Sequence, residues 1–123
     1  MTSRSDFPSP DELRIDPQPL TREQRREALQ LSIQEWSDCA WPAFRSDAWW
    51  TEYRRYLDSL AWKWRRRQTV RLAGGHCERC DRPLWGSWIA HHLTYDRVGY
   101  EAPNDLQALC HPCHELIHGR GER

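Results

Sequence analysis

The sequence has no net charge, no long apolar run and no internal repeat, and each absence excludes a class of protein. Lys and Arg together number 18, as do Asp and Glu, so the charge of the whole chain indicates no particular partner. No uncharged apolar segment is long enough to cross a bilayer, and residues 1–20 lack the apolar run and small-residue cleavage site of a secretory signal. We therefore expect a cytoplasmic protein with no membrane partner.

The charges are nevertheless unevenly distributed along a chain whose 123 residues suffice for one domain. Residues 53–82 carry nine basic and three acidic side chains, whereas the segments before and after them are both net acidic. Among the basic residues are Lys63, Arg65, Arg66, Arg67 and Arg71. Because Trp and Tyr residues lie between and before them, we interpret this run as a surface that binds nucleic acid. A solvated helix face is the alternative.

Proline content and helical periodicity divide the first half of the chain. Residues 1–20 hold four of the eight prolines and no amphipathic period, which predicts a disordered tail. A helix is expected from about Arg22 to Trp36, because Thr21 and Gln24 have the spacing of a capping box and apolar residues then recur at helical intervals.

Two further helices are predicted before the first cysteine pair. Ser46 can cap one of them, and the other should run from about residue 60 to 73 and end at Gly74-Gly75. Residues 21–58 are thus expected to be a helical N-terminal extension, with a separate module over residues 59–123. The extension could pack on that module, bind a partner protein or form a homodimer.

Four of the five cysteines form two C-x-x-C pairs, Cys77 with Cys80 and Cys110 with Cys113. In a chain without a secretory signal, this pattern favours tetrahedral zinc coordination over disulfides. Structural zinc contributes on the order of 10 kcal/mol to the folding of small peptides, so the ion would hold together two segments that have little core between them. Cys39 lies outside both pairs, and we expect it only to pack.

Four histidines are placed so that they could act together. His114 and His118 are one helical turn apart, so both imidazoles can face one ion. His91 and His92 are adjacent on a predicted strand and must therefore point to opposite faces. One of these two can bind a metal while the other acts on water.

The second half of the chain is expected to contain two strands and a helix. Residues 84–92 can form one strand and residues 93–95 its return strand. Residues 103–105 have the composition of a loop, and residues 112–118 that of a short helix. With the preceding helices, these elements predict an α+β fold.

Taken together, these segments resemble the HNH endonuclease family, in its zinc-bearing branch of small phage and bacterial proteins. That branch has C-x-x-C, then H-H, then an ending of the form D/N-L-x-x-L-C-x-x-C-H-x-x-x-H. The chain matches it over roughly residues 59–118, through the segments HHLTYDRVGYE and DLQALCHPCHELIH. The resemblance implies a zinc-stapled ββα-metal module, preceded by amphipathic helices, that hydrolyses phosphodiester bonds of DNA with the help of a metal.

The resemblance also implies a role for individual residues. Structural zinc would be held by Cys77, Cys80, Cys110 and Cys113, and the catalytic divalent ion, which is Mg²⁺, Mn²⁺, Ni²⁺ or Zn²⁺, by His91, His114 and His118. His92 would be the general base. Asp105 stands where the family has an asparagine that braces, through hydrogen bonds, the loop holding the general base. Unlike that asparagine, an ionised aspartate can accept but not donate hydrogen bonds. Arg97 and Glu101 match an R-x-G-x-E pattern that would position phosphate and orient the site, with an exposed ion pair as the alternative.

Two other functions compete with this interpretation. His114-Glu115-x-x-His118 also fits the H-E-x-x-H motif of zinc proteases, in which the glutamate activates water. That function needs a third ligand, usually well downstream, and only five residues follow His118. The stronger alternative is a non-catalytic zinc module that binds nucleic acid through its basic helix, but such a module would not need the four histidines together.

Overall fold

The computed structural model describes residues 19–118, which form four α-helices, a short 3-10 helix and a two-stranded antiparallel sheet. The predicted tail over residues 1–20 lies, apart from its last two residues, outside the described residues. The mixture of helices and an antiparallel sheet confirms the coarse part of the predicted fold class. In chain order the elements are α2 (Arg22–Ser37), α3 (Asp47–Leu57), α4 (Leu60–Leu72), β1 (Ile89–His92), η2 (Pro103–Asp105), β2 (Leu106–Leu109) and α5 (His111–His118).

The helices begin at the caps that the sequence predicts. The Thr21 hydroxyl accepts a hydrogen bond from the Gln24 N–H at 3.0 Å, and the Gln24 side chain accepts one from the Thr21 N–H at 2.9 Å. Ser46 caps α3 and Ser59 caps α4 in the same way. The helix α4 ends before Gly74-Gly75, whose φ angles of 66° and 77° continue the chain in the left-handed region.

The predicted strand pairing is wrong in one respect. Residues 93–95 do not form the return strand, and β1 pairs instead with β2, with His92 opposite Leu106 and Ile89 opposite Leu109. No glycine, proline or asparagine follows His92 at the point where a tight hairpin would need one. The chain therefore makes a longer excursion over residues 93–105 before it returns. The strand β1 is also shorter than predicted, because Gly86, at a φ of 69°, interrupts the extended backbone before it.

A single hydrophobic cluster connects the N-terminal helices to the sheet. It includes Trp36 of α2, Tyr56 of α3, Trp62 of α4 and Leu106 of β2. The ring centroids of Trp36 and Tyr56 are 5.1 Å apart. The helix α2 is also tied to α4, because the Ser32 hydroxyl accepts a hydrogen bond from the backbone N–H of Ala61 at 3.0 Å. Residues 21–58 thus pack on the rest of the chain, and the proposed boundary at residue 58 stays a prediction.

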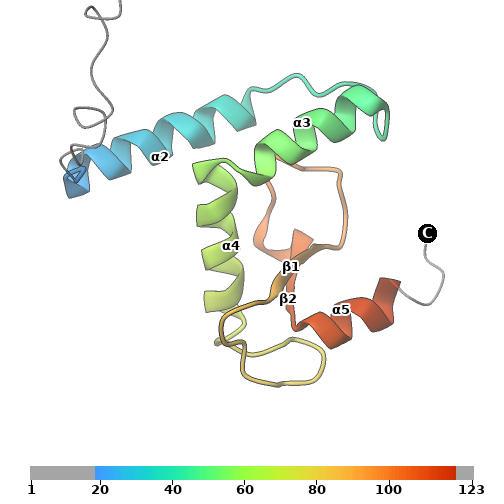
Figure 1. Ribbon diagram of the computed structural model, residues 1–123. Helices are drawn as coiled ribbons and strands as arrows, with labels where there is room; N and C mark the ends of the chain where they lie inside the picture. Colours follow the sequence, from blue (N-terminus) through green and yellow to red (C-terminus); the bar gives the residue numbers. More distant parts are fainter. Residues whose placement is uncertain (1–18, 119–123) are drawn as a thin grey trace, which may run out of the picture.

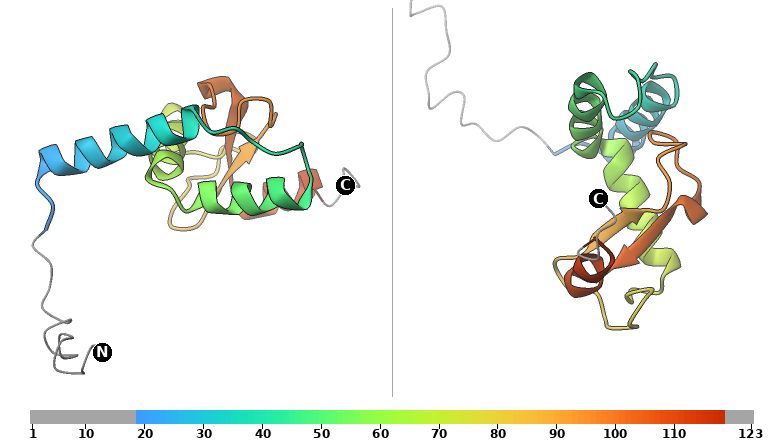
Figure 2. Two further views of the ribbon diagram at one scale, coloured as in Figure 1. Left: turned by 90° about the horizontal axis from the view of Figure 1, so that it is seen from above. Right: turned by 90° about the vertical axis from the view of Figure 1, so that its right-hand side faces the viewer.

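The sheet lies between α4 and α5 (Figure 1). The helix α4 contacts both strands, and α5 contacts β1. In the right-hand view of Figure 2 the two helices again lie on different sides of the strands. Each face of this small sheet is therefore covered by one helix. The two faces of β1 consequently meet different sets of side chains.

Among residues 19–118, no helix combines the length and the apolar character needed to span a bilayer.

The aromatic cluster should dominate the stability of the helical part. Trp36 is 1% exposed, whereas Trp85 is 85% exposed. We expect Trp36→Ala to lower the free energy of unfolding by about 3–5 kcal/mol, because it leaves a large cavity in the core. The matched substitution Trp85→Ala should change it by no more than about 0.5 kcal/mol. Urea unfolding of both variants in zinc-containing buffer measures this, and equal midpoints would contradict the assignment of Trp36 to the core.

Candidate metal sites

Four sulfur atoms converge at one end of the sheet. Cys77 and Cys80 follow α4, while Cys110 and Cys113 stand at the junction of β2 and α5, and all four Sγ atoms lie within 4.8 Å of one another. A tetrahedral zinc ion with Zn–S bonds of about 2.3 Å places its sulfurs about 3.8 Å apart. The Sγ atoms of Cys80 and Cys110 are 3.7 Å apart. The cluster therefore has dimensions compatible with a structural zinc ion.

The surroundings of Cys77 and Cys113 shift the pKa values of these two thiols in opposite directions. Burial alone would raise the pKa of the Cys77 thiol, but the backbone N–H groups of Cys110, Cys80 and Arg79 lower it to about 6. Burial raises the pKa of the Cys113 thiol to about 11, and the neighbouring thiols add to this rise although the Arg79 guanidinium opposes it. Four thiolates so close together need a cation to neutralise them, which is the role that zinc has in such sites.

Three imidazoles form a second cluster on the face of β1 that is turned toward α5. One ring nitrogen from each of His91, His114 and His118 lies within 4.8 Å of the other two. His91 Nδ1 and His118 Nε2 are 3.3 Å apart. Two nitrogens that coordinate one ion tetrahedrally at about 2.05 Å would be about 3.3 Å apart. The structure thus brings together the three histidines that the sequence assigned to one ion.

The electrostatics of this second cluster suit metal binding. Burial lowers the pKa of His114, and the neighbouring rings of His118 and His111 lower it further. A neutral imidazole is the form that coordinates a metal. The three histidines line a pocket of about 410 Å³ together with residues of α3, α4 and β1, and we call it the histidine pocket. His92 and Arg66 also line it.

His92 points to the opposite face of β1 and is enclosed there by aromatic rings. It is 7% exposed and lies between Trp62 and Tyr95, whose ring centroids are each 5.1 Å from that of His92. Its Nε2 is 2.7 Å from Glu101 Oε2, and its Nδ1 is 3.2 Å from the Tyr53 hydroxyl. Because a carboxylate can only accept, Nε2 carries a proton, and in the neutral ring Nδ1 then presents its lone pair to the Tyr53 hydroxyl. His92 is thus held in one tautomer at the edge of the histidine pocket.

Glu101 is the centre of a buried polar network. It is 1% exposed, accepts a hydrogen bond from the Tyr56 hydroxyl at 2.5 Å and lies 3.7 Å from Nε of Arg65. Burial raises the pKa of Tyr56 well above its usual value, and the negative charge of Glu101 raises it further. Tyr56 therefore stays protonated and can donate. The expected alternative of an exposed ion pair between Arg97 and Glu101 is wrong, because Glu101 pairs with His92 inside the protein.

Asp105 braces the loop that follows His92. Its carboxylate accepts two hydrogen bonds from Arg97 and one from the backbone N–H of Ala102 at 2.8 Å. The Arg97 guanidinium lowers the pKa of Asp105 below its usual range, although burial opposes this. The backbone carbonyl of Asp105 also accepts a hydrogen bond from the N–H of Leu93 at 2.8 Å. A residue that can only accept is sufficient here, because the groups that face it are donors.

The predicted nucleic-acid-binding residues do not form one surface. Arg65 turns inward to Glu101, and Arg66 donates to the backbone carbonyl of Trp88 and lies over its ring at 4.1 Å. Lys63, Arg67 and Arg71 are exposed and, at intervals of four residues, follow one side of α4. Arg97 is held by Asp105. The basic run is therefore divided between a buried network, the histidine pocket and the outer side of the helix.

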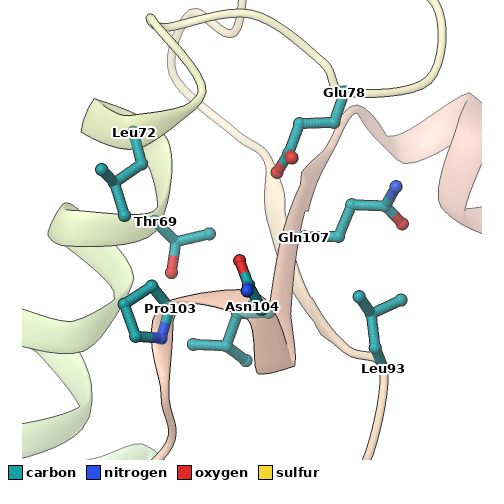
Figure 3. Close-up of a pocket in the computed structure, with 8 residues that line it drawn as sticks. Thr69, Leu72, Glu78, Leu93, Pro103, Asn104 and Gln107 are labelled. Carbon is teal, nitrogen blue, oxygen red and sulfur yellow. The ribbon is translucent and has the colours of Figure 1, made fainter.

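A separate hollow lies between α4, β2 and the loop after β1 (Figure 3). It has a volume of about 380 Å³, and none of the predicted site residues lines it. The Glu78 carboxylate on its wall accepts a hydrogen bond from the backbone N–H of Ala108 at 2.6 Å. Within the described part of the chain, the hollow holds neither of the two groups of side chains that could hold a metal ion and adds no third. We assign it no function.

Comparison with known proteins identifies no relative: no family model, no curated protein and no solved structure matches the chain.

Sequence reasoning missed the residues that surround His92. Tyr53 and Tyr56 come from α3, and they are 39 residues before His92 and 45 residues before Glu101 respectively. Their spacing on a helix identifies only a shared face, which is equally typical of a hydrophobic core. No local pattern indicates that the two hydroxyls meet a histidine and a carboxylate. These partners depend on how α3 packs on the loop before β2.

The cysteine cluster can be tested against the fifth cysteine as a control. Cys110→Ser should remove one zinc ion per chain and unfold the C-terminal half, because Leu109 and the cysteines form a cluster of their own there. Cys39→Ser should keep both zinc and fold, since Cys39 lies outside that cluster. Zinc content and circular dichroism measure the two effects. Unchanged values in Cys110→Ser would contradict a structural zinc site.

Proposed function

We propose that the protein is a metal-dependent endonuclease of the HNH type, which hydrolyses phosphodiester bonds of DNA in the histidine pocket. The observation that carries this proposal is the convergence of His91, His114 and His118 beside His92, next to a separate site of four cysteines. A binding module would have no need for two such clusters. The order of β1, β2 and α5 is that of a ββα-metal module, which further supports the proposal.

The three histidines would hold a divalent ion in the pocket. Their spacing fits a single ion, and neutral imidazoles leave that ion most of its positive charge. A divalent ion bound there would stabilise the negative charge that develops on phosphate during hydrolysis. Imidazole nitrogens suit Zn²⁺ and Ni²⁺ better than Mg²⁺, and Mn²⁺ is intermediate.

His92 acts as the general base in this proposal. Glu101 fixes the proton on Nε2, so the lone pair of Nδ1 is available to accept a proton from water. In the structure, Nδ1 faces the Tyr53 hydroxyl. Burial raises the pKa of Tyr53 well above its usual value, so Tyr53 stays protonated and does not compete as a base. A water molecule would reach Nδ1 from the histidine pocket, which Tyr53 and His92 both line.

Arg66 is the cation best placed to contact the phosphate. It lies on α4, lines the histidine pocket and is held in place by the carbonyl and ring of Trp88. A guanidinium has five N–H donors, so the contact with Trp88 leaves others for a phosphate oxygen. Arg65 is turned toward Glu101, with Nε 3.7 Å from the carboxylate, and in this proposal its role is to support the network that holds His92.

One observation favours the alternative of a non-catalytic zinc module. Both ring nitrogens of His92 already have partners, as expected of a histidine with a purely structural role. The protease alternative has less support. Glu115 is exposed and does not line the histidine pocket, although His114 and His118 on either side of it do. A glutamate that activates water would have to face the ion.

The histidine cluster should bind a metal ion that is separate from the zinc of the cysteines. We expect wild-type protein with intact zinc to bind one additional Ni²⁺ or Mn²⁺ per chain, and His118→Ala to lose this binding. His76→Ala is the control, because His76 is exposed and lies outside both clusters. Isothermal titration with each metal, accompanied by zinc analysis, distinguishes the two sites. Equal binding by wild type and His118→Ala would contradict the proposed ligand set.

The proposed role of His92 as general base should be tested with a substitution that still fills the space between Trp62 and Tyr95. His92→Gln keeps a polar side chain of similar size there but cannot take up a proton, and we expect nicking of supercoiled plasmid to slow by roughly 100-fold or more. Glu101→Gln should also slow nicking, because it no longer fixes the tautomer of His92. Plasmid assays with EDTA, Mg²⁺, Mn²⁺ and Ni²⁺ measure these rates.

The control for this experiment is His76→Gln, which should nick at the wild-type rate. Zinc content and circular dichroism must be equal in all variants, so that a loss of rate cannot come from unfolding. Wild-type rates in His92→Gln would exclude His92 as the base. No nicking by wild-type protein with any metal, together with plasmid binding, would favour the non-catalytic alternative.

A further inference from the structure

A groove of about 520 Å³ lies between α2 and α4, and we call it the α2–α4 groove. Its lining includes apolar residues of both helices, such as Leu29 and Leu60. Five cationic side chains also line the groove, and no carboxylate does. The five are Arg22, Arg25, Arg26, Lys63 and Arg67.

These five charges are not neutralised within residues 19–118. No ion pair in this part of the protein involves any of them, whereas Arg55, Arg65 and Arg97 each face a carboxylate. The glutamates of α2 at positions 23 and 27 do not line the groove, so the helix separates its charges onto different sides. Like charges collected from two helices repel one another, which gives the fold alone no reason to gather them. The groove is therefore complementary to an extended anion.

We propose that the α2–α4 groove binds the phosphate backbone of duplex DNA and anchors the substrate beside the histidine pocket. This inference rests on the proposed function, which it deepens by giving α2 a role in substrate binding. Arginine and lysine side chains that contact phosphates supply most of the sequence-independent affinity of proteins for DNA. Three of the five cations come from α2, a helix for which the sequence alone indicates no single role.

The helix α4 connects the groove to the proposed site of cleavage. Arg66 lines the histidine pocket, and the next residue, Arg67, lines the groove. The two hollows therefore lie on neighbouring sides of one helix, which is about 10–12 Å across with its side chains. One turn of duplex DNA is about 34 Å long, so a single duplex can contact both. This continuity favours DNA over an acidic protein segment, which would have no reason to reach the histidine pocket.

The test is the salt dependence of duplex binding. A fluorescently labelled DNA duplex is titrated with zinc-containing protein, without added catalytic metal, at several salt concentrations. The groove variant Arg26→Gln/Arg67→Gln removes one cation from each helix, and Arg22→Gln/Lys63→Gln is a second, independent variant. The control Arg45→Gln/Arg54→Gln removes two exposed arginines that do not line the groove.

In a plot of the logarithm of the binding constant against the logarithm of the salt concentration, we expect each groove variant to make the negative slope shallower by about 1.8. Each variant removes two cations, and each phosphate contact contributes about 0.9. The control should leave the slope unchanged. A wild-type slope in both groove variants, or no binding of duplex by wild-type protein, would overturn the inference. Tighter binding by the groove variants would also overturn it, because the groove would then hold an acidic segment that competes with DNA.

A second measurement separates this inference from the proposed function. Hydrolysis of bis(4-nitrophenyl) phosphate reports on the histidine pocket without contact to the groove, and the groove variants should hydrolyse it at the wild-type rate. If the groove variants also lost this activity, their substitutions would be acting on the histidine pocket, and the inference that the groove binds DNA would be overturned. Wild-type protein could bind duplex with a salt dependence that the groove variants reduce, yet hydrolyse no substrate. In that case DNA binding by the groove would be supported and the proposed hydrolase activity would be contradicted.

Discussion

The alternation of side chains along β1 is the constraint on which the arrangement of the site depends. His91 and His92 are consecutive residues of an extended strand, so one must face α5 and the other must face the N-terminal helices. A single element therefore supplies one group to the histidine cluster and one to the aromatic core. A shift of one residue in the register with β2 would exchange these roles and place His92 beside His114 and His118. The cysteine cluster lies at one end of the sheet and ties β2 and α5 to the segment after α4, which helps to fix this register.

The buried Glu101 connects the two parts of the chain electrostatically. A carboxylate that is 1% exposed is costly unless hydrogen bonds and a nearby cation compensate the loss of water. Tyr56 of α3 and Arg65 of α4 provide this compensation, and His92 completes it. The helices before the sheet therefore contribute polar groups to the surroundings of His92 in addition to packing against the sheet. They determine the environment, and hence the tautomer, of the histidine at the edge of the histidine pocket.

The sequence predicts the members of both clusters but not the surroundings of His92. C-x-x-C pairs and histidines four residues apart on a helix are local patterns, so the closeness within each pair follows from spacing. The resemblance implies that the two cysteine pairs meet and that His91 joins the histidine pair, and the structure brings these groups together. The contacts of His92 with Tyr53 and of Glu101 with Tyr56 depend instead on packing between distant segments, which spacing does not report. Residues 93–95 resemble a strand locally, which is why the sequence predicts a return strand there that the structure does not contain. The partner of β1 is decided by where the cysteine pairs and the loop over residues 93–105 hold the chain.

The basic helix shows how a charge run acquires several functions. Successive residues of a helix are rotated by about 100°, so five cations within nine positions cannot all face one partner. In α4 they divide by position: Arg65 compensates a buried carboxylate, Arg66 enters the histidine pocket and Arg67 lines the groove with Lys63. Only the exposed members of such a run can contribute to the salt-dependent affinity for DNA. In the proposed DNA complex, the charge of α4 that is available to the substrate is therefore smaller than the charge that the sequence displays, and α2 would supply the difference with three arginines of its own.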